Sequence, residues 1–421
     1  MIQMEDTGYN KESMEKALTD RRVKKLVVRT PDITLYSLNP TNMPDNKEWL
    51  FTRVDSQAIE RLNNNQRLYV NRVQAGCLPT WARMSVIRTG FFLSVATKEE
   101  ELQFFVERNA VSTLMKFLSL QGRAFVKSGL PRNILLKNEM DEQDLAISLV
   151  YREEKRVNRY GDKVTYRSIV AFRNEGFDTS HQLENLETAV NFWEQKGAVV
   201  DKWSQDQEKI SVRMVLPQMG EILFQGEYSL PKQVVPCITM REGETGDAAF
   251  RMQTGVVILA GTKETRQGAE ACAIGGLASG KAKTVLRLDT DTLEGLWNEA
   301  YRQFCGFASQ MHEMQGKRIS PAGNADDDGT WEARNMKQLR IFILSALKAC
   351  DFRKAVGVKR KDVLAEKMLG ALNPAKAYSA ADIALLFFKI PGWIKKWQCN
   401  ESVCDGASEN AARIVVMKEA A

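Results

Sequence analysis

The chain has 421 residues, of which 44% are hydrophobic and 27% are charged. These proportions are ordinary for a globular protein, and the length is large for a single core, so we expect two or three subdomains. The longest apolar runs are far shorter than the roughly 20 residues that cross a bilayer, and the first residues lack the basic and apolar regions of a signal peptide. We therefore expect a cytoplasmic protein without membrane contact.

The net charge of +6 is unevenly distributed along the chain. Residues 331–397 contain fourteen Lys and Arg but five Asp and Glu, a local excess of +9, so the remainder of the chain sums to −3. An excess of one sign in one part of a chain indicates a polyanionic partner better than the total charge does.

The cysteines and histidines predict no metal site. Seven cysteines are scattered through the sequence, an odd number that is typical of reduced thiols, and there are two histidines, His181 and His312. Zinc needs about four such ligands close together, which this sequence hardly supplies. Neither histidine has a nucleophile and a supporting carboxylate nearby in sequence, so we predict no catalytic residues and no cofactor.

The first 140 residues predict a mixed α/β part. Residues 11–19 favour a short helix, and residues 23–29 and 33–38 favour a pair of strands joined at Pro31. Residues 98–120 have apolar side chains at helical spacing and predict a long helix.

Residues 141–314 predict a central sheet domain. A β-hairpin is expected from residues 145–157 and 163–172, with Arg159-Tyr160-Gly161-Asp162 as its turn. Helices are expected at residues 179–196 and 292–314, with short strands between them. The central sheet is expected to be antiparallel, with the helices packed on it.

Residues 315–330 are polar and rich in Gly, Pro and Asp, so we expect a linker there. Residues 331–421 then form a basic helical subdomain, with helices expected at 331–350, 360–372 and 379–396. The fold class predicted from these elements is α+β.

A glycine-rich segment at residues 275–281 matches the G-x-x-x-x-G-K core of a phosphate-binding loop. Ala282 replaces the Ser or Thr that would hold magnesium, and residues 283–288 favour a strand where such a loop needs a helix. We interpret the segment as a glycine-rich surface loop without nucleotide hydrolysis.

The expected hairpin interleaves basic and aromatic residues. Cations contact phosphates and aromatic faces stack on bases, which is the chemistry of a single-strand binder. The same residues could form an exposed hairpin with balanced charges, or an arm that lies over a neighbouring subunit. The residues are Tyr151, Arg152, Lys155, Arg156, Arg159, Tyr160, Lys163, Tyr166 and Arg167.

A second basic group lies in the C-terminal helices. Such a cluster attracts a polyanion, although a run of charge is often a solvated helix face. The candidate residues are Arg353, Lys354, Lys359, Arg360, Lys361, Lys395 and Lys396.

The middle of the chain has the order strand, helix, hairpin and then Ile238-Thr239-Met240-Arg241-Glu242-Gly243-Glu244-Thr245-Gly246-Asp247. Over about residues 165–260 this resembles a phage- and plasmid-borne family of uncharacterised proteins, in which similar elements precede an acidic Thr-Gly or Ser-Glu-Gly turn. The resemblance implies a phage-like origin and brings no catalytic residues.

From these observations we predict a non-enzymatic, phage-like protein that binds nucleic acid, with single strands favoured, and that self-associates, for example in annealing strands. The alternative is a viral shell or capsid subunit that uses residues 145–172 as an intersubunit arm. That alternative would place the protein in the virion rather than in the host cytoplasm alone.

Overall fold

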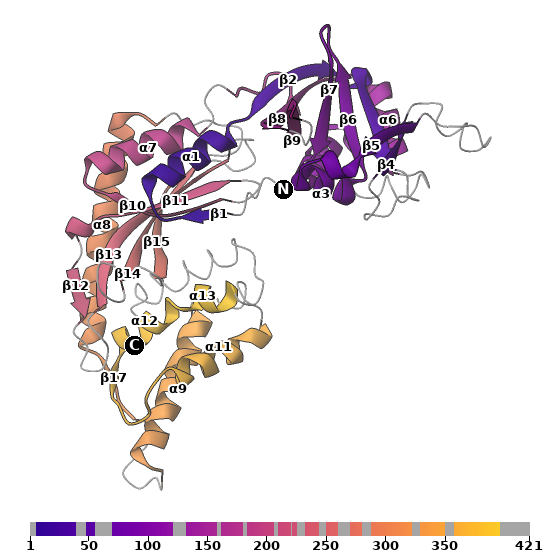
Figure 1. Ribbon diagram of the computed structural model, residues 1–421. Helices are drawn as coiled ribbons and strands as arrows, with labels where there is room; N and C mark the ends of the chain where they lie inside the picture. Colours follow the sequence, from indigo (N-terminus) through magenta and orange to yellow (C-terminus); the bar gives the residue numbers. More distant parts are fainter. Residues whose placement is uncertain are drawn as a thin grey trace. The chain divides into compact units, whose positions relative to one another are not determined.

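The computed structural model describes residues 6–38, 48–54, 70–120, 132–157, 161–179, 183–205, 209–219, 221–224, 232–243, 250–259, 270–279, 288–321, 329–349 and 358–395 (Figure 1). The chain divides into two compact units. Unit 1 comprises Met1–Glu184 with the short segments Ser204–Ile210 and Gly243–Ala248, and unit 2 comprises the remainder. Each unit combines helices with a β-sheet, so the predicted α+β class is confirmed.

Unit 1 is built on an eight-stranded sheet with the order β2-β8-β9-β7-β6-β3-β4-β5. The pairing of β7 with β9 is parallel, and the other pairings in this sheet are antiparallel. The strands are β2 (Lys24–Arg29), β3 (Ile33–Leu38), β4 (Glu48–Val54), β5 (Val70–Gln74), β6 (Phe91–Ala96), β7 (Glu101–Val106), β8 (Ala146–Val157) and β9 (Lys163–Asn174).

Helices cover both faces of this sheet. On one face, α4 (Arg108–Phe117) and α6 (Arg132–Gln143) pack on a core that includes Leu93, Phe104 and Leu149. On the other face, α3 (Thr80–Thr89) packs on a core that includes Trp49 and Phe92. The remaining elements of the unit are β1 (Asp6–Gly8), α1 (Lys11–Arg21) and the 3-10 turns η1 (Thr30–Asp32) and η2 (Ala75–Cys77).

Two predictions for the N-terminal part are wrong. The helix expected at residues 98–120 is instead strand β7 followed by helix α4, because Phe104 and Phe105 are both buried on opposite faces of a sheet that is covered on both sides. Strands β2 and β3 flank the expected turn but do not pair with each other. Strand β2 pairs with β8, whereas β3 pairs with β4 and β6.

The domain boundary expected at residues 140/141 is also not where the two units separate. The predicted hairpin exists as β8 and β9, but it lies inside the sheet of unit 1, between β2 and β7. Its backbone hydrogen-bonding groups are shared with strands from the first 106 residues, so it cannot belong to a separate central domain.

Unit 2 contains a second sheet with helices packed on it. Its strands β10, β11, β13, β14 and β15 lie side by side in that order, and β12 pairs with β13. Trp193 of α7 and Trp297 of α8 have ring centroids 4.9 Å apart, and both line a small apolar pocket with Cys237 of β13. The elements are α7 (Glu184–Gln195), β10 (Val199–Gln205), β11 (Ile210–Val215), η3 (Pro217–Met219), β12 (Glu221–Phe224), β13 (Lys232–Glu242), β14 (Arg251–Leu259), β15 (Glu270–Ser279) and α8 (Thr290–Gln315).

The C-terminal helices share one hydrophobic core with α8. Phe307 and Met311 of α8 pack in the same cluster as Leu339, Leu364 and Phe387. These helices therefore complete unit 2 rather than forming the separate subdomain that was expected. They are α9 (Trp331–Ala349), α11 (Val358–Gly370), α12 (Ala380–Phe387) and α13 (Ile390–Lys395).

Part of the expected linker is ordered structure. Strand β16 (Arg318–Ile319) pairs with β17 (Tyr378–Ser379), and Ile319 is buried in the shared core. Residues 322–328 of the expected linker lie outside the described residues. Within the described part of the chain, every helix is too short or too polar to cross a membrane.

Candidate functional site

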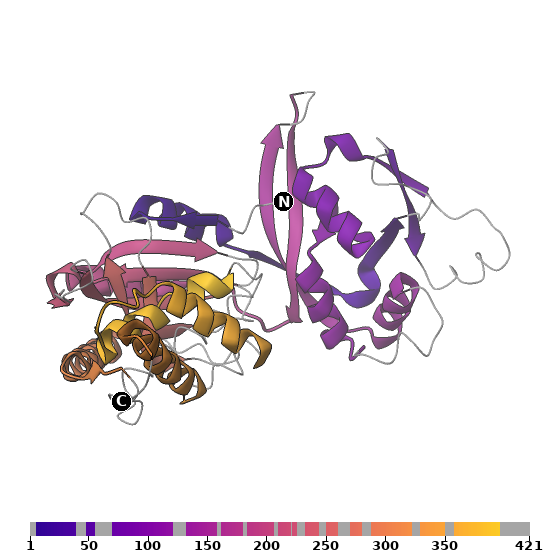
Figure 2. The same ribbon diagram turned by 90° about the horizontal axis from the view of Figure 1, so that it is seen from below.

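Strands β8 and β9 extend past their neighbours in the sheet of unit 1. They pair with each other from Ile147↔Asn174 to Val157↔Lys163, but β2 pairs with β8 only as far as Tyr151, and β7 pairs with β9 only at Ser168 and Ile169. Residues 152–157 and 163–167 therefore form a two-stranded ribbon with no further strand of the described residues beside it, visible as the long magenta strands of Figure 2. We call this segment the ribbon; at about 3.4 Å per residue it is about 17 Å long.

Arg152 lies at the base of the ribbon and is enclosed by the sheet. Its side chain is 2% exposed, and its Nη1 atom lies 3.4 Å from Oε1 of Glu107, which also accepts a hydrogen bond from Ser168 Oγ at 2.8 Å. A guanidinium held in this way does not reach the surface. Arg152 was predicted to bind nucleic acid, and the structure places it in a buried ion pair instead.

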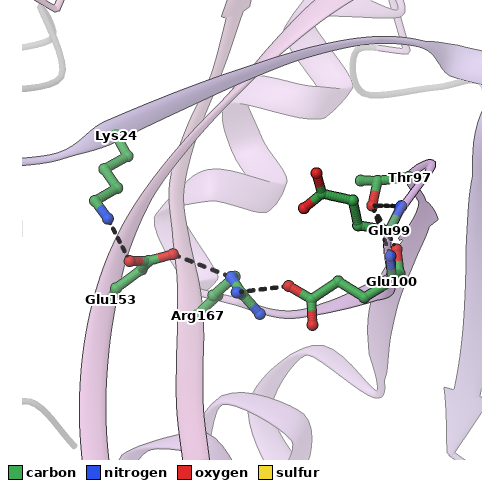
Figure 3. A network of polar contacts seen from close by, with 6 residues as sticks. All are labelled: Lys24, Thr97, Glu99, Glu100, Glu153 and Arg167. Carbon is green, nitrogen blue, oxygen red and sulfur yellow. Dashed lines mark hydrogen bonds and ion pairs between the residues drawn. The ribbon is translucent and has the colours of Figure 1, made fainter.

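Arg167 belongs to a chain of ion pairs that fastens the ribbon to the rest of unit 1 (Figure 3). It pairs with Glu153 on the adjacent strand at 3.1 Å and with Glu100, in the turn between β6 and β7, at 3.5 Å; Glu153 also pairs with Lys24 of β2. Burial acts to raise the pKa of Glu153, but the hydrogen bonds and charges of Lys24 and Arg167 outweigh it, and the pKa is lowered. Arg167 therefore positions the ribbon, with its charge compensated.

Arg156 is also compensated, on the opposite face of the ribbon. Its guanidinium pairs with Glu154, and the other carboxylate oxygen of Glu154 accepts a hydrogen bond from Trp81 Nε1 of α3. Arg156 remains exposed on its outer side, so it could still contact a ligand, but at the cost of its bond to Glu154.

Lys155 and Lys163 are exposed, and neither makes an ion pair or hydrogen bond with any described residue. Residues directly opposite each other in an antiparallel pair point to the same face. Lys155 lies opposite Thr165, and Val157 lies opposite Lys163, so the two lysines share one face of the ribbon with Val157, which is 66% exposed. Asp162, which precedes Lys163, is exposed as well. Arg159 and Tyr160, predicted to be in the turn, lie outside the described residues.

The tyrosines at the base of the ribbon belong to the cores of unit 1. Tyr151 is 8% exposed and meets Phe104 edge to face, with ring centroids 5.1 Å apart. Tyr166 packs in the core beneath α3 and donates a hydrogen bond to the Cys77 carbonyl at 3.0 Å. Burial raises the pKa of both phenols. The aromatic part of the predicted single-strand site is therefore absent at these two positions.

The second basic group lies in unit 2 and is only partly described. Lys359, Arg360 and Lys361 fall in the first turns of α11, and Lys395 ends α13. The side chain of Lys361 is half-buried, and the side chains of the other three are not described. Arg353, Lys354 and Lys396 lie outside the described residues.

The glycine-rich segment is not the surface loop that was expected. Gly275 and Gly276 lie within strand β15, opposite Thr254 and Gln253 of β14, where the register shifts. Glycine is common at such irregularities because the strand bends there. A phosphate-binding loop would follow the strand rather than lie inside it. Gly280 and Lys281 lie outside the described residues.

The described residues contain no group of three or more His, Cys, Asp or Glu side chains that could hold a metal ion. His312, near the end of α8, has Nδ1 3.3 Å from Gln315 Oε1, and His181 is not described. Comparison of the chain with protein-family models, with curated proteins and with solved structures finds no match.

Sequence reasoning missed ion-pair partners that lie outside the hairpin, such as Glu107, which pairs with Arg152, and Lys24, which pairs with Glu153. Glu107 and Lys24 lie 45 and 129 residues from the side chains that they contact in the ribbon. No local sequence pattern could indicate these pairs, because they depend on which strands become neighbours in the sheet.

Proposed function

We propose that this protein binds nucleic acid through the ribbon formed by β8 and β9. The observation that carries the proposal is the pair of exposed lysines, Lys155 and Lys163, on one face of a ribbon that extends past the sheet. Two cations on one face that pair with no described carboxylate favour a polyanion, because phosphate contacts release condensed counterions.

The charge of unit 2 supports the same class of partner. Helix α11 begins at Val358 and has no acidic residue in its first turn, so Lys359, Arg360 and Lys361 lie at the positive end of the helix dipole. Cations at that end destabilise a helix unless an anion is near. The excess of +9 over residues 331–397 acts in the same direction.

The test is a titration of the full chain with fluorescein-labelled DNA, followed by anisotropy at 50 and 200 mM salt. We expect binding at 50 mM that weakens at 200 mM, and a clear loss of affinity in the double variant Lys155→Ala/Lys163→Ala. The matched control is Lys16→Ala/Lys116→Ala, which removes two exposed lysines from α1 and α4 and should behave as the unmodified protein. Absence of binding to single-stranded and double-stranded DNA at both salt concentrations would refute the proposal.

A second candidate function is that of an assembly subunit with the ribbon as an intersubunit arm. The observation that favours it is Val157, a large apolar side chain that is 66% exposed on the ribbon. An isolated two-stranded ribbon is only marginally stable in water, and packing against another subunit would stabilise it. In that case Val157→Ser, but not Ile87→Ser on α3, should reduce the mass measured by light scattering at high protein concentration. Closed shells or tubes in negative-stain images would favour this candidate, and a monomer at all concentrations would exclude it.

A further inference from the structure

The ribbon has the features of a surface that contacts the nucleic-acid backbone and leaves the bases unread. Binding to single strands without sequence preference depends on cations together with aromatic faces on which bases stack. Of the described tyrosines of the ribbon and its base, Tyr151 is buried in one core of unit 1, and Tyr166 is half-buried, packs against the other core and donates its hydroxyl to the Cys77 carbonyl. The described part of the ribbon thus presents charge without a stacking surface.

The cations without an ion-pair partner among the described residues of the ribbon lie on one face. Diagonal neighbours across an antiparallel pair are about 7–8 Å apart, which places the Lys155 and Lys163 stems close enough for both ammonium groups to lie along one phosphate backbone. On the opposite face the guanidinium of Arg156 is held by Glu154, which is in turn held by Trp81. The face with the two lysines also contains Glu153, but that carboxylate is occupied by Lys24 and Arg167 (Figure 3).

The ion pairs at the base keep the ribbon in one orientation. Arg167 bridges the ribbon to the β6–β7 turn through Glu100, and Thr97 orders that turn by donating to the Glu100 carbonyl at 2.7 Å and accepting from its backbone N–H at 3.1 Å. Lys155 and Lys163 thus lie on a regular two-stranded ribbon that ion pairs fix to the rest of the sheet. A two-stranded ribbon is one of the elements that the major groove of a duplex admits.

We infer that the preferred ligand of the ribbon is double-stranded nucleic acid, bound through phosphates by Lys155 and Lys163 without reading of the base sequence. This inference rests on the proposed function, and it replaces the preference for single strands that was expected from the sequence. Duplex DNA carries one charge per about 1.7 Å of axis, against about 3.4 Å for each of its strands. Because the affinity of the ribbon depends on the charge density of its ligand, we expect the duplex to bind more tightly than the single strand.

The salt dependence of binding measures the number of phosphate contacts. Each contact on duplex DNA contributes about 0.9 to the slope of log K against log salt, so loss of two contacts lowers the slope by about 1.8. Between 50 and 200 mM salt the unmodified protein should therefore lose about twelvefold more affinity for a duplex than Lys155→Ala/Lys163→Ala does. The control Lys16→Ala/Lys116→Ala should keep the original slope.

The experiment compares a 30-base-pair duplex, the corresponding 30-base single strand and a duplex of unrelated sequence, each labelled with fluorescein, by anisotropy on the full chain. We expect the two duplexes to bind equally and more tightly than the single strand, with Tyr160→Ala leaving duplex affinity within about twofold, since stacking supplies no part of it. Tighter binding of the single strand, a large loss in Tyr160→Ala, or an unchanged slope in the lysine double variant would overturn this inference and leave nucleic-acid binding intact. Absence of binding to all three would overturn the proposed function itself.

Discussion

The assignment of Arg152 to the sheet rather than to a ligand can be tested by replacing it with methionine, which keeps an unbranched apolar stem but removes the guanidinium and its charge. Arg152 is 2% exposed and lies 3.4 Å from Glu107, whose side chain is 13% exposed. After Arg152→Met, the Glu107 carboxylate remains largely buried and keeps its hydrogen bond from Ser168. Removing one partner of a buried ion pair costs about 3–5 kcal/mol, because the other charge is left uncompensated.

The measurement is hydrogen exchange of the β8 and β9 backbone, resolved by mass spectrometry so that unit 1 is observed separately from unit 2. A loss of about 3 kcal/mol accelerates exchange of the most protected amides by a hundredfold or more, since each 1.4 kcal/mol is a factor of about ten. Lys155→Ala, a surface change, should shift the same amides by less than about 0.5 kcal/mol.

A double variant separates the charge from the packing. Replacing the whole pair, as Arg152→Met/Glu107→Leu, leaves no uncompensated charge, and buried pairs replaced by apolar residues are often close to neutral. We therefore expect most of the lost protection to return. If Arg152→Met leaves exchange in β8 and β9 unchanged but weakens nucleic-acid binding, the residue is a ligand contact and the reasoning from burial is wrong.

Three further predictions concern single residues in the two units. Burial raises the pKa of the Cys237 thiol to about 12, so iodoacetamide at pH 8 should label exposed Cys305 in the folded protein well before Cys237, as read by mass spectrometry; equal rates would contradict this. The pKa of Glu153 is lowered in the folded state, so its ion pairs stabilise unit 1 above the ordinary Glu pKa and are lost as the pH falls through the lowered value. The stability difference between the unmodified protein and Glu153→Gln, measured by urea unfolding, should therefore shrink below about pH 4, and a constant difference down to pH 2.5 would count against the network. Gly197 follows α7 with φ of +87° and has Gln218 side-chain atoms 3.0 Å from where a Cβ would lie, so Gly197→Ala should cost about 1–2 kcal/mol in unit 2, whereas Gly295→Ala, in the open on α8, should cost nothing or stabilise.

Elements whose signals are local could be predicted from the sequence. The helix expected at residues 292–314 is α8, Thr290–Gln315, because its apolar stripe is long and Asp289 caps it by accepting from the Thr292 backbone at 2.7 Å. The hairpin of β8 and β9 was similarly predicted. Strand β7 was not predicted, because Leu102, Phe105 and Val106 also fit helical spacing. Helices on both faces of the sheet allow Phe104 and Phe105 to be buried on opposite faces of a strand.

For the candidate site, the hairpin could be located from the sequence. Which of its basic residues are buried in ion pairs and which are exposed could not. Arg152, Lys155 and Lys163 are equivalent as basic residues of one hairpin. They differ because Arg152 lies near the end of β7 and pairs with Glu107, whereas the two lysines lie beyond the neighbouring strands. Glu107, the partner of Arg152, directly follows β7, and the parallel pairing of β7 with β9 joins segments about 60 residues apart. Such long-range pairing follows from the packing of the whole sheet and leaves no periodic signal at either segment.

The two open edges of the ribbon have a consequence for solubility. Beyond Tyr151 on β8, and before Ser168 on β9, the outward backbone N–H and C=O groups pair with no other strand in the described part of the chain. Such edges invite pairing with another chain, and charged side chains, lysine above all, are the usual protection against it. Lys155 and Lys163 thus keep these edges apart in the unbound protein. The variant Lys155→Ala/Lys163→Ala should therefore aggregate through its ribbons at concentrations where the unmodified protein remains soluble.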